Sequence, residues 1–138
     1  MIVLPASSRL LQLEAIIAAQ LDGGSLRLYK NELTPTVDSI LADFTVANFT
    51  GYANKTIATW GTPYLDALGL ATVLGGLQTW TCTDAVTPNQ IYGCYYVDAG
   101  GELIFAERFS SPIPMGSADE VLNMVPKYQV GNIEGPVL

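Results

Sequence analysis

The residues of this chain that could support catalysis are carboxylates lying close together in the sequence. Two such side chains act as general acid and general base in glycoside hydrolysis when they flank the bond that breaks. The candidate pairs are Asp38 with Asp43, Glu102 with Glu107, and Asp119 with Glu120. Glu102 and Glu107 lie five positions apart on a predicted strand, so their side chains point to opposite faces. No sequence signature supports any pair, and we expect no catalytic residues.

Most other catalytic and metal-binding chemistry is excluded because the chain contains no histidine. Histidine is the side chain that most often serves as a base near neutral pH, and it is the commonest metal ligand. Cys82 and Cys94 are too few for a four-ligand zinc site. They either form a disulfide or remain buried free thiols, which behave as small hydrophobic side chains. The sequence therefore predicts a protein that is not an enzyme and has no metal or cofactor.

Aromatic side chains suggest a different kind of site. Trp60 and Trp80, together with seven tyrosines, could form a platform on which sugars stack. Such residues more often belong to the core of a β-sandwich. Carbohydrate binding or host adhesion is therefore an alternative function.

The composition predicts one domain whose surface carries few charges. Of the 138 residues, 49% are hydrophobic and 14% are charged, against about 25% charged in an average soluble domain. The net charge is −7 and the basic residues occur singly, which argues against nucleic-acid binding. Residues 1–6 lack the features of a secretory signal, and the apolar stretch 67–77 is too short to span a bilayer. We expect a soluble protein with no membrane partner, part of whose surface another protein covers.

A helix is predicted near the N-terminus. Ser7 or Ser8 can cap its first turn, it runs to about Leu21, and Gly23 and Gly24 end it. Beyond this point β-branched and aromatic residues alternate with short turns, which is typical of an antiparallel β-sandwich or a jelly-roll-like fold. The fold class is therefore mainly β with a short N-terminal helix.

One face of the predicted helix is apolar at helical spacing. Its members are Leu10, Leu13, Ile17 and Leu21. Two interpretations remain open. In the first, this stripe packs on the chain's own sheet. In the second, residues 1–24 form an N-terminal arm whose stripe is an assembly interface with a neighbouring subunit, and residues 25–138 form the β-sandwich domain.

The predicted strands are residues 26–30, 56–60, 77–83, 91–98, 102–109 and 121–130. Residues 98–101 connect two of them as a hairpin, because their glycines supply the positive φ that such turns need. Pro126 predicts an edge or a bend in the last strand. Both faces of the hairpin from 91 to 109 are largely apolar, unlike a sheet with one face in water. We expect its second face to be covered either by residues 31–54 and the N-terminal helix or by another subunit.

Residues 31–54 interrupt the strand pattern. A short helix is predicted over 37–42, and Phe44, Phe49 and Tyr52 are expected to anchor the rest. Flexible loops seldom carry so many aromatic residues. We call residues 31–54 the excursion and expect it to be ordered.

Several short segments between roughly residues 26 and 130 form a pattern that is found in a known group of proteins. They are Leu28-Tyr29-Lys30-Asn31, Thr34-Pro35, Ala42-Asp43-Phe44-Thr45, Phe49, Gly51-Tyr52-Ala53, Trp60, Tyr92-Gly93-Cys94-Tyr95-Tyr96-Val97-Asp98 and Ala106-Glu107-Arg108-Phe109. On these residues the chain resembles small accessory structural proteins of tailed bacteriophages, especially capsid decoration or cement proteins.

The resemblance implies a virion protein made in the cytoplasm of the bacterial host and located on the capsid exterior. Its partners would be the major capsid protein and itself, as a homotrimer, and it would stabilise the shell by bridging capsid subunits. Another virion role, in head completion, the tail or the baseplate, is an alternative to decoration.

Overall fold

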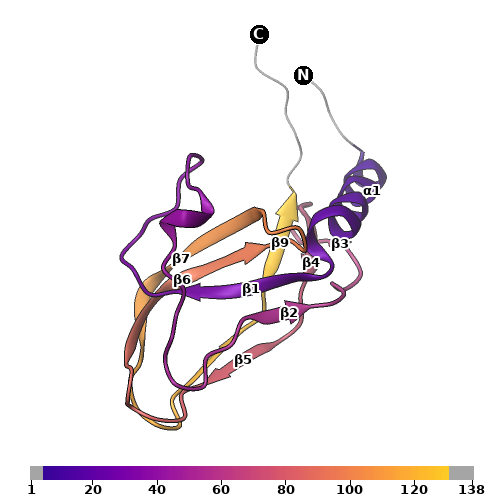
Figure 1. Ribbon diagram of the computed structural model, residues 1–138. Helices are drawn as coiled ribbons and strands as arrows, with labels where there is room; N and C mark the ends of the chain where they lie inside the picture. Colours follow the sequence, from indigo (N-terminus) through magenta and orange to yellow (C-terminus); the bar gives the residue numbers. More distant parts are fainter. Residues whose placement is uncertain (1–4, 131–138) are drawn as a thin grey trace.

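The computed structural model describes residues 5–130, which form a mainly β fold with one helical segment at the N-terminal end (Figure 1). The helical segment is α1 (Ala6–Ile16), continued by a π-helical turn (Ile17–Leu21). The strands are β1 (Gly24–Tyr29), β2 (Lys55–Ile57), β3 (Tyr64–Leu65), β4 (Ala71–Leu74), β5 (Gln78–Thr81), β6 (Asn89–Val97), β7 (Leu103–Met115), β8 (Val121–Met124) and β9 (Lys127–Val130).

The described strands form three antiparallel sheets in a sandwich-like arrangement. The largest has the order β2-β1-β6-β7, and the smaller ones have the orders β3-β4-β9 and β5-β8. The main core lies where these sheets meet. Leu28 and Tyr96 of the largest sheet belong to the same buried cluster as Val73, Trp80 and Leu122 of the smaller ones. The alternation of side chains along each strand thus turns one face of the largest sheet toward this core, where residues of β1 and β6 are buried and those of β7 are mostly half-buried.

The predicted hairpin between β6 and β7 is confirmed. Asp98 N donates to Glu102 O at 2.9 Å, and Glu102 N donates to Asp98 Oδ1 at 2.8 Å. Gly101 has a φ of +93°, which a residue with a Cβ rarely adopts. β7 extends beyond the predicted end at 109, because residues 113–115 still pair with β6. Its two prolines are tolerated because β7 is an edge strand.

The last predicted strand is instead two strands in different sheets. β8 pairs with β5 and β9 pairs with β4, and Pro126 lies at the bend between them, as expected for a residue without an N–H. β3 and β4 were not predicted. β4 lies inside the glycine-interrupted stretch 67–77, and its four residues are too few to show a strand pattern.

The helix begins earlier than the serine cap predicts. α1 starts at Ala6, so Ser7 and Ser8 lie inside its first turn, and no side chain caps this end. Its C-terminal end is as predicted. Gly23 has a φ of +82° and donates its N–H to Ile57 O at 2.9 Å, which ties the helix end to β2.

The apolar stripe of the helix belongs to the chain's own core. Leu13 and Leu21 have no exposed surface, Ile17 is 8% exposed, and Leu10 is partly buried against the same cluster. Trp60 Nε1 donates to the carbonyl of Leu21 at 3.1 Å. The structure therefore corrects the assembly-interface assignment: the core occupies these side chains and leaves Leu13 and Leu21 no surface for a partner. Residues 5–24 are part of the β domain rather than a separate arm, and residues 1–4 lie outside the described residues.

Candidate interaction surface

The excursion covers the second face of the β6–β7 hairpin. The ring of Phe44 stacks on that of Tyr95, with centroids 4.7 Å apart, and meets the ring of Tyr29 edge-on at 5.2 Å. These three residues and Val97 form a buried cluster separate from the main core. Of the two interpretations of this face, cover by the chain itself therefore holds. The excursion provides it, whereas the helix that was expected to share this role packs in the main core. Phe49 is buried as predicted.

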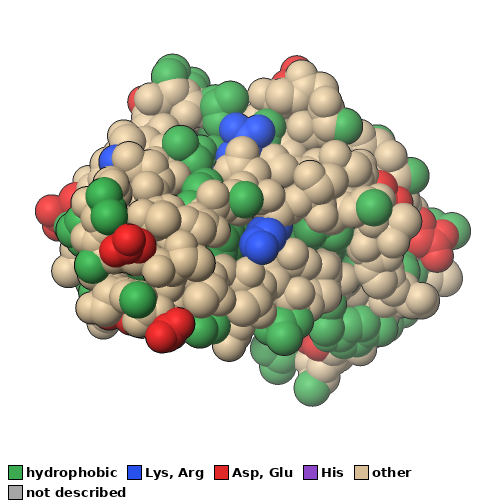
Figure 2. Space-filling model, turned by 60° about the horizontal axis from the view of Figure 1, so that its bottom comes forward, with side chains coloured by type: hydrophobic (Ala, Val, Ile, Leu, Met, Phe, Trp, Pro, Cys, Tyr) green, Lys and Arg blue, Asp and Glu red, His purple; other side chains and the backbone are tan. Residues whose placement is uncertain are grey.

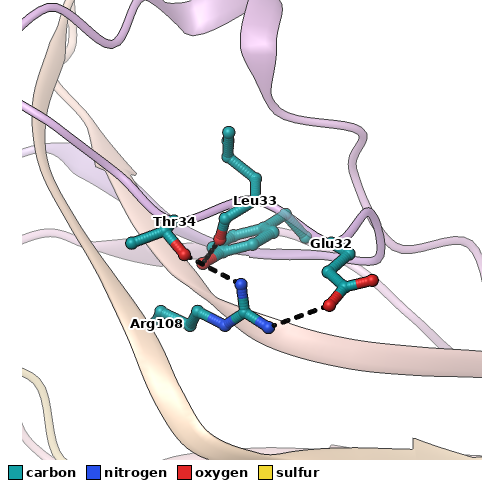
Figure 3. A network of polar contacts seen from close by, with 5 residues as sticks. Glu32, Leu33, Thr34 and Arg108 are labelled. Atoms are coloured by element: carbon teal, nitrogen blue, oxygen red, sulfur yellow. Dashed lines mark hydrogen bonds and ion pairs between the residues drawn. The ribbon is translucent and has the colours of Figure 1, made fainter.

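Arg108 of β7 fixes the start of the excursion (Figure 3). Its Nη1 donates to Thr34 Oγ1 at 2.9 Å, and its Nη2 lies 3.5 Å from Glu32 Oε1. The Tyr29 hydroxyl donates to Leu33 O at 2.9 Å beside it. Burial raises the pKa of Tyr29 even though the Arg108 charge opposes this, so the phenol keeps the proton that it donates. Because the ion pair is partly exposed, it contributes at most about 1 kcal/mol and acts mainly to position the segment.

The outer end of the excursion is an ordered loop with exposed apolar side chains. Thr36 N donates to Ser39 Oγ at 2.8 Å, Ser39 N donates to Thr36 O at 3.1 Å, and Ile40 N donates to Asp43 Oδ2 at 3.0 Å. The helix predicted over 37–42 is only a 3-10 turn (Leu41–Asp43), because these side-chain bonds compete with helical ones. We call Val37, Ile40 and Leu41 the apolar tip. Val37 is fully exposed and Ile40 is 60% exposed.

A groove of about 510 Å³ separates this loop from β7. One wall is formed by residues 35–37 and Ser39, and the other by residues 103–106 of β7. We call it the edge groove. Within residues 5–130, β7 pairs with β6 on one side only, so its other side is a free strand edge.

The edge groove has few polar side chains available to a ligand. Thr36 and Ser39 are its only lining side chains with hydroxyls. The hydroxyl of Ser39 accepts from Thr36 N, and that of Thr36 accepts from Asp38 N at 3.2 Å. Each hydroxyl thus accepts a bond within the loop and still has its O–H to donate. The other lining side chains are apolar, so the groove presents mainly apolar side chains and strand backbone.

Three of the carboxylates considered for catalysis hold or form turns of the backbone. Asp43 accepts from Ile40 N as described, and Glu120 Oε2 accepts from Gly116 N at 2.9 Å. Asp119 lies in a turn with a φ of +70°. Among the described residues no three His, Cys, Asp or Glu side chains cluster so as to hold a metal ion.

The cysteines and tryptophans are core residues. Cys82 and Cys94 are buried free thiols, so the second of the two expectations for them holds. Burial raises the pKa of Cys94 to about 12, and the Glu107 charge adds to this effect, so its thiol is not a nucleophile near neutral pH. Trp60 and Trp80 are 7% and 1% exposed. They therefore form no exposed stacking platform for sugars.

Sequence reasoning missed the apolar tip and the edge groove. The available signal was the presence of Val37, Ile40 and Leu41 within a segment of turn-forming residues, where exposed apolar side chains are unusual. The groove itself depends on the contact between the excursion and β7, which lie about seventy positions apart in the sequence.

The sequence matches no protein-family model, and comparisons with curated proteins and with solved structures found no match. Among the described residues there is no helix long and apolar enough to cross a membrane.

Proposed function

We propose that this chain is a structural protein of a tailed-bacteriophage particle that binds the outer capsid surface as a homotrimer and stabilises the shell by bridging capsid subunits. The observation that carries the proposal is the apolar tip, an ordered loop whose side chains lie in water. A loop held by several side-chain hydrogen bonds and ending in Val37, Ile40 and Leu41 is suited to insertion into a partner rather than to chemistry.

A bridging protein needs at least two contact regions, and a second exposed apolar group supports this role. Leu74, Leu77 and Val125 are 37%, 65% and 45% exposed. The chain segments that carry them lie side by side, because Gly75 N donates to Pro126 O at 2.9 Å. This group follows the end of β4, away from the loop that carries the apolar tip in Figure 1.

The surface as a whole is poor in charge. Figure 2 shows a face on which hydrophobic side chains reach the surface in several separate groups among few charged ones. Burying such groups contributes about 25 cal/mol per Å² before the costs of association. Contacts of this kind stabilise a shell without any reactive group, which fits the resemblance to decoration proteins.

The proposal is tested by adding the purified chain to empty heads of the phage that carries it. Light scattering is expected to give an oligomer of three times the monomer mass of 14.7 kDa. This oligomer is expected to co-sediment with the heads and to raise their melting temperature. A monomer that leaves the heads unchanged would refute the proposal.

Copy number separates decoration from other virion roles. Decoration predicts many copies distributed over the whole shell. A single ring of copies at one vertex or along the tail would instead assign the chain to head completion, the tail or the baseplate.

A further inference from the structure

The free edge of β7 differs along its length. Pro112 and Pro114 lie in its C-terminal half, where the missing N–H groups hinder the addition of another strand. Residues 103–109 contain no proline, and residues 103–106 form one wall of the edge groove. The half of the edge that can pair is therefore the half that lines the groove.

The lining of the groove favours a peptide over a small polar molecule. Small-molecule sites usually place a few convergent polar side chains among apolar ones. Here the two lining hydroxyls, of Thr36 and Ser39, both lie on one wall of the groove, whereas the backbone of the β7 edge is unpaired among the described residues. An extended peptide satisfies such an edge with main-chain hydrogen bonds, and its alternate side chains contact the apolar walls.

The charges around the groove define the chemistry of that peptide. Asp38, Glu102 and Glu107 are exposed, each adjoins a lining residue, and none forms an ion pair within residues 5–130. The nearby cation, Arg108, is paired with Glu32. We call these three carboxylates the acidic rim. Glu107 lies opposite Cys94, on the face of β7 that is turned away from the excursion. A strand added beside β7 has neighbours on both of its faces, so all three carboxylates attract basic side chains of such a strand.

The same rim argues against a second copy of the chain as the occupant. A second β7 edge would bring its own Glu102 and Glu107 to this rim, and like charges on adjacent strands are destabilising. The chain's net charge of −7 acts in the same direction. A partner of opposite charge fits better.

We propose that the edge groove binds an extended segment of the capsid protein that carries apolar and basic side chains and adds as a strand beside residues 103–109 of β7. This inference rests on the proposed function and names the contact surface and the chemistry of the partner.

The direct test is a titration of the ¹⁵N-labelled full chain with two synthetic seven-residue peptides, one alternating lysine with valine and the other alternating glutamate with valine. The lysine peptide is expected to shift and protect the amides of residues 103–109, and to bind more weakly at high salt. The glutamate peptide is expected to bind at least about tenfold more weakly, because its charges have the sign of the rim. No binding of the lysine peptide, equal binding of both, or shifts confined to residues outside the two walls of the edge groove would overturn the proposal.

Two exposed positions supply variants with matched controls. Glu107→Lys is expected to raise the dissociation constant of the lysine peptide about fivefold or more, whereas Glu14→Lys, the same charge change on an exposed position of α1, leaves it unchanged. Val37→Ser is expected to weaken binding, whereas Val86→Ser, at a position 75% exposed outside the groove, does not. Equal effects of a variant and its control would contradict the assignment.

Other occupants are separate outcomes of the same experiments. If deleting residues 131–138 is needed before the peptide binds, the chain's own C-terminal segment occupies the groove and the proposal fails. It also fails if Glu107→Lys changes the oligomeric state of the free chain, because the edge then joins two copies.

Binding to empty heads distinguishes this inference from the proposed function. If the unmodified chain binds heads and Glu107→Lys binds them equally well, the groove is not the contact surface but the decoration role stands. If the chain binds the lysine peptide through residues 103–109 but does not bind heads, the groove is a peptide site and the decoration role fails.

Discussion

Replacing Leu13 by alanine tests whether the N-terminal helix belongs to the core of the β domain. Leu13 has no exposed surface and packs in the main cluster, on a helix that lies against β3 and β4. Leu11, two positions away on the same helix, is 64% exposed. Leu11→Ala is therefore a matched control with the same chemical change and the same effect on helix propensity.

The expected magnitude follows from burial. Truncating a fully buried leucine costs about 2–5 kcal/mol, because the transfer free energy of the removed carbons is lost and a cavity remains. We expect about 3 kcal/mol for Leu13→Ala and less than about 0.5 kcal/mol for Leu11→Ala. With an unfolding entropy of about 2.1 cal/mol/K per residue, the 138-residue chain loses about 10 °C of melting temperature in the first variant.

The assay is urea denaturation followed by tryptophan fluorescence, which reports the core because Trp60 and Trp80 are both buried. The midpoint is expected to fall for Leu13→Ala with an unchanged slope, and to stay at the wild-type value for Leu11→Ala. Equal midpoints for all three proteins would show that the helix is not packed in the core, and the reasoning would be refuted.

Two further predictions concern buried groups. Tyr96→Phe is expected to cost only about 1 kcal/mol in the free energy of unfolding. The reason is that the Leu21 carbonyl, to which the Tyr96 hydroxyl donates, still accepts from Trp60 Nε1. A loss above about 3 kcal/mol in urea denaturation would contradict this. The pKa values of Cys94 and Tyr52 are raised to about 12, so folding favours their protonated forms. The free energy of unfolding is therefore expected to be full below pH 9. It is expected to fall between pH 9 and 12, because the thiol and the phenol then ionise in the unfolded chain. Alkaline denaturation curves should show this fall, and a smaller fall for Cys94→Ala; a stability that rises over this range would contradict the assignment.

The fold class was predictable because local signals agreed with the tertiary structure. Glycines at 100 and 101 fixed the turn between β6 and β7, and Gly23 fixed the end of the helix. Strands that carry several β-branched or aromatic residues were found, although β7 runs on to Met115 past its predicted end at 109 and the last predicted strand is two strands. β3 and β4 were missed because they have two and four residues and owe their conformation to pairing with other strands.

The role of the helix stripe was not decidable from spacing alone. Leu10, Leu13, Ile17 and Leu21 have the periodicity of any buried helical face, and periodicity does not say whether the covering surface belongs to the same chain. The candidate site was equally hidden. It depends on the excursion turning back over β7, an arrangement fixed by Phe44 and by the Arg108 contacts rather than by any local motif.

The central claim, that this chain works through surface contacts on a virus particle, is tested most directly by cryo-electron microscopy of that particle. The account predicts density for the β domain on the outside of the shell, repeated over its whole surface, with the loop of residues 36–43 and the edge of β7 facing a capsid subunit. Density confined to one ring, or a particle that lacks the chain, would contradict it.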